Sequence, residues 1–174
     1  MPSFTPQAIT QAVNDHINEV TYGAVDSVTK CNFFVRDVVE SLLAASYPAL
    51  HAKANDQFDA LAAATAEWSS LSFASDPGGK FTEALAAANS GNLVIVAYKN
   101  PDANSSGHIA IIVPSPGMED SGAWAMKVPF IAHAGKKNPR NQPAEANQSV
   151  FAALKLSFAF KVSMIPTMEI FVLK

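Results

Sequence analysis

The sequence is poor in cysteine and in charged residues, and each shortage excludes certain kinds of protein. Cys31 is the single cysteine among 174 residues, so an intrachain disulfide and a zinc site built from several thiolates are excluded. Charged residues make up 16% of the chain and give a net charge of −3 without a basic run, so nothing points to nucleic-acid binding. No apolar run approaches the ~18 residues that a membrane-spanning helix needs. The first residues also lack the basic patch and apolar run of a secretory signal, so we expect none.

Hydrophobic residues, by contrast, are plentiful and make up 49% of the chain. A chain of this length and composition is able to bury a core of its own, and it is too apolar to be disordered. No internal repeat, low-complexity tract or linker divides it. We therefore predict one globular domain over residues 1–174, with no cofactor and no metal.

Apolar spacing predicts helices in the first half of the chain and strands in the second. Thr5 followed by Pro6 is typical of a capped helix start, and Gly91 is typical of a helix end. The predicted helices cover about 6–20, 32–45, 52–68 and 81–89, and the predicted strands cover about 92–98, 108–113, 124–133, 154–161 and 168–173. Helices followed by an antiparallel sheet give an α+β fold.

Cys31 stands at the start of the second predicted helix. The backbone N–H groups and dipole of a helix N-terminus favour an anion, so a thiol there has a lowered pKa and is more reactive. We accordingly expect a thiol that solvent reaches. The alternative is that Cys31 is a small hydrophobic residue of the core.

A thiolate nucleophile needs a base, and the base needs a third group to orient it. His108 opens an apolar strand directly after Gly107, and His133 stands at the far end of another predicted strand. If His108 faces the second helix, the small Ala110 on the same face lets that helix pack closely. The alternatives are a strand-end histidine bonded to a turn for His108 and an ordinary loop residue for His133.

These residues lie in two segments that resemble a known family. Residues 31–35, Cys-Asn-Phe-Phe-Val, resemble the Cys-x-x-Phe-Val nucleophile motif of NlpC-type and CHAP peptidases, which are papain-like amidases of the bacterial cell wall. Residues 107–112, Gly-His-Ile-Ala-Ile-Ile, resemble their Gly-His-Val-Ala-Val-Val motif. The layout over about 21–133 is most similar to the small peptidoglycan amidase effectors of type VI secretion. The chain reads Lys-Cys-Asn-Phe where NlpC-type enzymes read Asp-Cys-Ser-Gly, which favours a divergent branch.

The resemblance implies a papain-like fold, N-terminal helices on an antiparallel sheet, with a catalytic set of Cys31, His108 and His133. Cys31 would be the nucleophile, His108 the base, and His133 a neutral substitute for the usual orienting carboxylate. Should His133 not serve, Asn138 in the polar loop that follows is the next candidate. The oxyanion and substrate-binding residues implied by position are Tyr22, Lys30 and Asn32, together with the backbone N–H of Cys31.

The function that we expect is therefore cleavage of an amide bond in peptidoglycan peptide stems. The protein would be a secreted antibacterial effector, made in the cytoplasm and acting in the periplasm of a target bacterium, with an immunity protein and secretion machinery as partners. One alternative is a papain-like deamidase or acyltransferase that acts on a protein. The other is a catalytically silent cell-wall-binding module, in which Cys31 belongs to the core.

Overall fold

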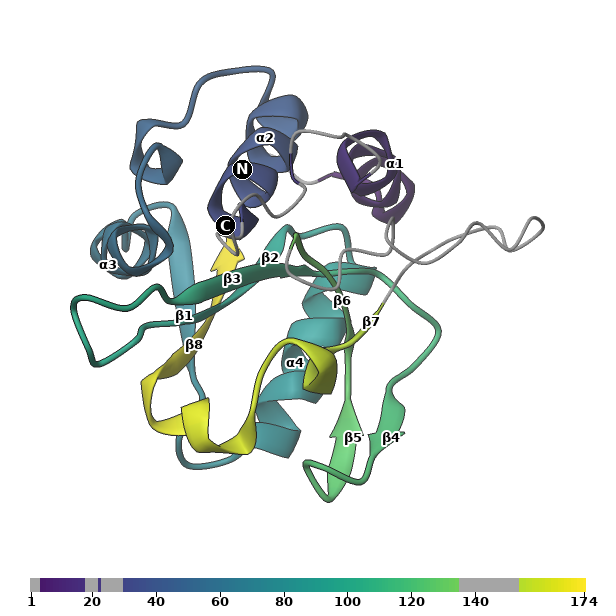
Figure 1. The fold of residues 1–174 in the computed structure, drawn as a ribbon. Coiled ribbons are helices and arrows are strands. Elements are labelled where there is room, and N and C mark those ends of the chain that lie inside the picture. The colour runs from purple at the N-terminus through teal and green to yellow at the C-terminus, as the bar shows by residue number, and fades with distance from the viewer. Residues whose placement is uncertain (1–3, 18–21, 23–29, 135–153) are drawn as a thin grey trace.

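The computed structural model describes residues 4–17, 22, 30–134 and 154–174, and it has mixed α and β structure (Figure 1). The α-helices of the described residues are α1 (Pro6–Ile17), α2 (Cys31–Leu43), α3 (Ala54–Ala63) and α4 (Pro77–Asn89). The strands are β1 (Trp68–Ser72), β2 (Val94–Tyr98), β3 (His108–Ile112), β4 (Glu119–Ser121), β5 (Met126–Val128), β6 (Phe130–Ala132), β7 (Leu154–Lys155) and β8 (Met168–Leu173). Short 3₁₀ helices are η2 (Pro48–Leu50), η4 (Leu156–Phe158) and η5 (Val162–Thr167).

The helix ends follow from local chemistry. The hydroxyl of Thr5 accepts a hydrogen bond from the backbone N–H of Ala8 at 3.0 Å, which confirms the predicted cap of α1. α4 begins the same way, because the carboxylate of Asp76 accepts from the backbone N–H of Gly79 at 3.0 Å. Gly91 follows α4 with a φ of +88°, a left-handed conformation in which glycine is favoured, and this agrees with its predicted role at the helix end.

Six strands form an antiparallel sheet in the order β1-β8-β2-β3-β6-β7, and β4 and β5 form a separate two-stranded ribbon. Figure 1 shows α1, α2 and α3 on one face of the sheet and α4 on the other. His108 pairs with Tyr98 across β2 and β3, and Ile111 pairs with Ala132 across β3 and β6. The predicted α+β class and antiparallel sheet are thus present.

Several elements differ from the sequence prediction. The alanine-rich helix stops at Ala63 rather than near Trp68, and Trp68–Ser72 is the strand β1, which pairs with β8 at the sheet edge. The predicted strand over 124–133 is two short strands, β5 and β6, and β5 pairs with β4, which was not predicted. Over 154–161 only two residues form a strand before the chain turns into a 3₁₀ helix. These elements depend on partners that are distant in sequence, which local spacing does not reveal.

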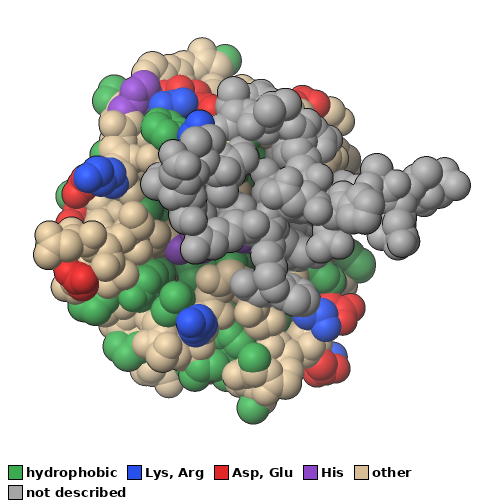
Figure 2. Space-filling model, in the orientation of Figure 1, with side chains coloured by type: hydrophobic (Ala, Val, Ile, Leu, Met, Phe, Trp, Pro, Cys, Tyr) green, Lys and Arg blue, Asp and Glu red, His purple; other side chains and the backbone are tan. Residues whose placement is uncertain are grey.

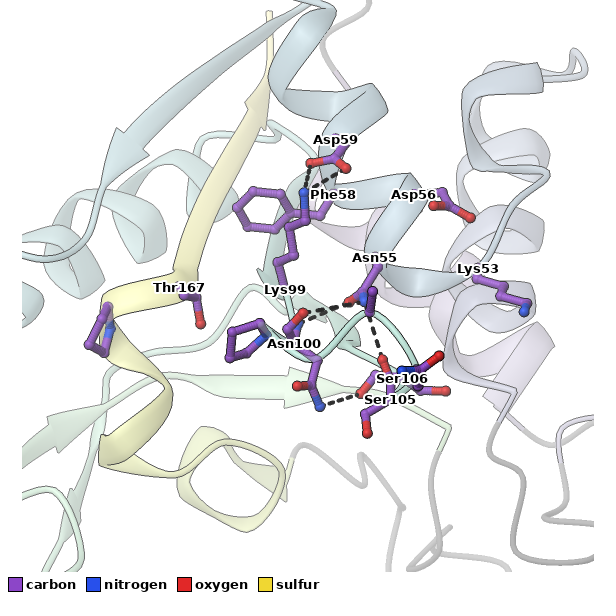
Figure 3. Close-up of a pocket in the computed structure, with 14 residues that line it drawn as sticks. Lys53, Asn55, Asp56, Phe58, Asp59, Lys99, Asn100, Ser105, Ser106 and Thr167 are labelled. Carbon is purple, nitrogen blue, oxygen red and sulfur yellow. Dashed lines mark hydrogen bonds and ion pairs between the residues drawn. The ribbon is translucent and has the colours of Figure 1, made fainter.

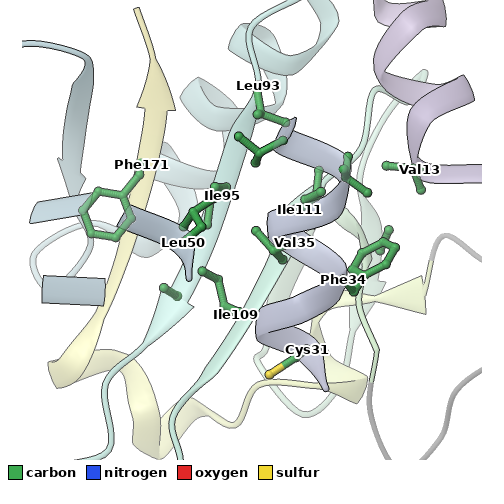
Figure 4. Packing of buried hydrophobic residues seen from close by; sticks show 14 of the residues in the cluster. Val13, Cys31, Phe34, Val35, Leu50, Leu93, Ile95, Ile109, Ile111 and Phe171 are labelled. Carbon is green, nitrogen blue, oxygen red and sulfur yellow. The ribbon is translucent and has the colours of Figure 1, made fainter. Parts of the chain in front are cut away.

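The sheet is buried on both faces, and this arrangement positions the candidate site. Ile109 and Ile111 pack with α2 in one hydrophobic cluster, as Figure 4 shows, whereas Ala110 and Ile112 pack with α4 in a second cluster. Because side chains alternate along a strand, His108 is expected on the α4 face with Ala110. The condition under which Ala110 is expected to make room for α2, that His108 faces this helix, is therefore not met.

Within the described residues, none of the helices combines the length and the apolar character needed to cross a membrane.

Candidate active site

Cys31 is the first residue of α2, as the sequence predicted. Lys30, the N-cap residue, makes no side-chain hydrogen bond to this helix end. The side chain of Cys31 is only 2% exposed and belongs to the cluster that contains Ile109 and Ile111. The prediction of a thiol that solvent reaches is therefore wrong, although the thiol does stand at the electropositive end of the helix.

Two amide side chains hold the first turn of α2 against α3 and the residues just before it. Asn32 Nδ2 donates to the backbone carbonyl of Ala52 at 2.8 Å, so this predicted substrate-binding side chain has a structural partner. The side chain of Gln57 is fully buried, and its Nε2 donates to the carbonyls of Leu50 and Asn32 at 2.6 and 3.1 Å. Gln57 Oε1 is buried and has no hydrogen-bond partner in the described part of the chain. Gln57 thus sets the position of the turn that carries Cys31, a role that no sequence motif indicated.

The structure brings the two predicted histidines together. His108 Nε2 and His133 Nδ1 are 3.2 Å apart, a hydrogen bond in which one nitrogen donates and the other accepts. The rings meet edge to face with 5.0 Å between centroids, and the ring of Phe160 lies 5.0 Å from that of His108. Among the described residues, His133 Nε2 is buried without a hydrogen-bond partner.

Burial keeps both imidazoles neutral near pH 7. Loss of hydration, and to a smaller extent the charge of a protonated His133, lowers the pKa of His108 to about 3. Burial also lowers the pKa of His133 to about 4. A neutral His108 has a lone pair on one ring nitrogen with which it is able to accept a proton, and its lowered pKa makes it a weaker base than an exposed imidazole.

Cys31 and His108 lie at the same end of the sheet, but their surroundings are on different faces of it. Figure 4 shows Cys31 at the end of α2 that lies beside Ile109, the residue after His108. Phe160, which the His108 ring contacts, belongs to the cluster on the α4 face. A contact between the thiol and the imidazole would therefore have to form around the end of β3.

Tyr22 is buried and does not present its hydroxyl to the thiol. The hydroxyl donates to a carboxylate oxygen of Asp37, six residues beyond Cys31 along the chain, and the ring packs edge to face against Phe34. The predicted oxyanion role of this hydroxyl is not supported by the geometry. Asn138, the alternative orienting residue, lies outside the described residues.

Asn55 on α3 and Gly107 together set where His108 begins its strand. Asn55 Oδ1 accepts from the backbone N–H of Asn100 at 2.9 Å, and its Nδ2 donates to the carbonyl of Ser105 at 3.2 Å. A Cβ on Gly107 would lie 2.3 Å from the Tyr98 carbonyl and 2.4 Å from Asn55 Oδ1, so only glycine fits there. The glycine before His108 was visible in the sequence, but its partner Asn55 lies 52 residues earlier and gave no signal.

Across the described residues, no group of three or more His, Cys, Asp or Glu side chains is placed to hold a metal ion. On the face in Figure 2, the charged side chains outside the grey region stand singly or in small groups of both signs. No protein-family model and no curated protein matches the chain.

Proposed function

We propose that the protein is a cysteine amidase that hydrolyses an amide bond in peptidoglycan peptide stems. Cys31 is the nucleophile, His108 its base, and His133 the residue that orients His108. The proposal is supported above all by one observation, a thiol at the first residue of a helix at the same sheet end as a hydrogen-bonded histidine pair. The choice of the cell wall as substrate, and of a secreted antibacterial effector as the context, comes from the resemblance of residues 31–35 and 107–112 to wall amidase motifs.

In the first half of the reaction, the proton of the Cys31 thiol passes to His108 and Sγ attacks the carbonyl carbon. The electron pair of the carbonyl moves to its oxygen, where the first backbone N–H groups of α2 are suited to stabilise the negative charge. The C–N bond then breaks as His108 returns its proton to the leaving amine, and a thioester on Cys31 remains.

Water completes the reaction. It gives a proton to His108 while its oxygen attacks the thioester carbonyl, and the C–S bond then breaks. His108 returns the proton to the departing sulfur, so the products are a carboxylic acid, an amine and the original thiol.

The hydrogen bond to His133 uses Nε2 of His108, which leaves Nδ1 as the nitrogen for the thiol. Nothing within the described residues bonds to Nδ1. When His108 accepts a proton there, its Nε2–H donates to His133 Nδ1, so His133 fixes the tautomer that the reaction needs. Contacts between nucleophile and base are often looser without substrate, so a Sγ–Nδ1 contact that forms on binding is compatible with this arrangement.

Digestion of purified peptidoglycan, with mass analysis of the fragments, tests the proposal. The parent protein should release stem peptides with a new amine and a new carboxylate, and Cys31→Ala should release none. Because Cys31 is buried, the alanine variant should also lose about 1 kcal/mol in free energy of unfolding, so its folded fraction has to be measured alongside. Digestion by a folded Cys31→Ala variant would reject the mechanism.

The burial of Cys31 specifically favours a second candidate, a wall-binding module without catalysis. Iodoacetamide separates the two functions, because an activated thiol reacts near neutral pH whereas a core thiol reacts only when the protein unfolds. If the protein is a wall-binding module, it should sediment with peptidoglycan but leave the stem peptides intact.

A further inference from the structure

A cavity of about 670 Å³ lies between the start of α3, the turn that joins β2 to β3, and the end of η5 (Figure 3). Its volume is within the usual range for small-ligand sites. Most of the lining residues are polar, with two lysines, two aspartates, three asparagines and two serines among them.

The walls of this cavity continue into the segments that carry Cys31 and His108. Ser106 lines the cavity and is two residues before His108. Lys53 also lines the cavity. It follows Ala52, whose carbonyl accepts the hydrogen bond from Asn32, the neighbour of Cys31. A molecule held in the cavity would therefore lie near the segments that carry the candidate catalytic residues.

Part of the polar lining is already used to hold the walls in place. Asn55 bonds the backbone of the turn, as Figure 3 shows, and Lys99 Nζ contacts both carboxylate oxygens of Asp59 at 2.6 and 2.7 Å. These contacts hold the cavity in a preformed shape. The same groups already have hydrogen-bond or ion-pair partners, so few of their donors and acceptors remain for a ligand.

Two charged side chains of the lining remain available. Lys53 and Asp56 have no ion-pair partner in the part of the chain that is described, and both line the cavity. They are three residues apart at the start of α3, so their side chains leave the helix on the same side. Asn104 and Ser106 add side-chain groups able to bond a peptide backbone. The cavity thus offers one cation and one anion together with neutral hydrogen-bonding groups.

We propose that this cavity binds the part of the substrate next to the scissile amide, and that this part is a short peptide carrying both a carboxylate and an ammonium group. Lys53 takes the carboxylate and Asp56 the ammonium. The inference rests on the proposed function, because it supplies the substrate-binding part of the same site.

Four tetrapeptides with blocked ends test the charge preference. One contains Glu and Lys between two alanines, and in the others alanine replaces the Glu, the Lys or both. Each is titrated at low salt into the Cys31→Ala variant, which binds but does not cleave, and affinity is followed by calorimetry or NMR. The peptide with both charges should bind most tightly, with about two- to fivefold contributed by each charge, the range of partly exposed ion pairs.

Variants assign each charge to its residue. Lys53→Met should abolish the preference for Glu and keep the preference for Lys, and Asp56→Asn should do the reverse. Lys127 and Asp120 form a matched control, because they are exposed and face each other on β5 and β4, away from the cavity. Lys127→Met and Asp120→Asn should leave both preferences unchanged.

Equal affinity for the four peptides, no binding at all, or the same loss in control and cavity variants would each overturn the inference. Because binding is measured without cleavage, its outcome is separate from that of wall digestion. A charge preference that depends on Lys53 and Asp56 supports the cavity as a peptide site even if no wall is digested, in which case the amidase proposal alone is rejected.

Discussion

The hydroxyl of Tyr22 donates to Asp37, and its ring packs edge to face on Phe34 with 5.7 Å between ring centres. Asp37 is also bonded by the guanidinium of Arg36, at 2.6 Å. Tyr22 therefore ties its own segment to α2, and its hydroxyl hydrogen is already used. A structural role explains these contacts, whereas an oxyanion donor would need that hydrogen to point at the substrate.

Tyr22→Phe should accordingly destabilise the protein and leave turnover nearly unchanged. Removing one partner of a partly buried hydrogen bond to a charged group costs about 1 to 3 kcal/mol, which denaturant unfolding would measure. Tyr98→Phe is the control, because within the described residues the Tyr98 hydroxyl has no hydrogen-bond partner, and it should cost much less. A 10²- to 10³-fold loss in rate, typical of a lost oxyanion donor, would restore the catalytic role of Tyr22.

The hydrogen-bonded histidines also lead to a prediction for single residues. If His108 and His133 act as one unit with Cys31, the double variant His108→Ala/His133→Ala should digest peptidoglycan no more slowly than His108→Ala alone. His133→Asn should recover part of the loss of His133→Ala, because an amide oxygen is able to accept the imidazole N–H. In each histidine variant that digests peptidoglycan more slowly, the pH dependence of the alkylation rate of Cys31 should also shift.

His51→Ala is the control. It removes an exposed histidine bonded to Glu40 and should change neither the digestion rate nor the pH dependence of alkylation. If the loss of rate in the double variant equals the product of the losses in the two single variants, the two histidines act separately.

At the scale of elements, α3 controls the geometry of two neighbours. Gln57 bonds the first turn of α2, and Asn55 bonds the turn between β2 and β3. In both cases a side chain of α3 bonds the backbone of the neighbouring segment, so the contact does not depend on the side chains of that segment. The first turn of α3 thus lies between the segments that carry Cys31 and His108.

Gly107→Ala tests this link. The added Cβ would lie 2.3 Å from a backbone carbonyl, so the turn or α3 has to move, at a cost of about 1 to 3 kcal/mol, as for other overpacked sites. The imidazole NMR signals of His108 and His133 should shift, and digestion should fall even where the protein remains folded. Gly117→Ala is the control, because nothing lies within 4 Å of its added Cβ, and it should be nearly neutral. Unchanged imidazole signals in Gly107→Ala would show that the turn does not position His108.

At the scale of the whole molecule, two neutral histidines with lowered pKa values make stability depend on pH. Both have folded-state pKa values, about 3 and about 4, below the ordinary value of 6.5. Between about pH 4 and 6.5 the unfolded chain therefore binds protons that the folded chain does not. The free energy of unfolding should be unaffected by these groups above pH 6.5 and should fall as pH drops below it, by up to about 1.4 kcal/mol per pH unit for each histidine.

Thermal unfolding of the parent and of His133→Gln from pH 7.5 to pH 4.5 would measure this contribution. The variant removes one of the two groups, so its unfolding temperature should fall less steeply with acid than that of the parent. Ile131→Val, which weakens the neighbouring core without removing a histidine, should keep the parent slope. Equal slopes for the parent and His133→Gln would mean that His133 binds protons equally in the folded and unfolded protein, which would contradict its lowered pKa.

Local chemistry in the sequence was enough to predict many of the elements. The Thr5 cap, the start of α2 at Cys31 and the apolar runs of β2, β3 and β8 depend on residues close together in the chain, so their signals are complete within one segment. β1 is a strand because β8 lies beside it, across about a hundred residues, and its sequence alone is mostly serine.

The candidate site divides in the same way. The sequence by itself determined that a thiol begins a helix and that each histidine borders a strand, because caps and apolar periods are local. Only the tertiary structure decided that His108 meets His133, that Cys31 is buried against Ile109, and that Tyr22 bonds Asp37. Strand register and helix packing determine these contacts, and both depend on long-range burial, which a one-dimensional pattern does not contain.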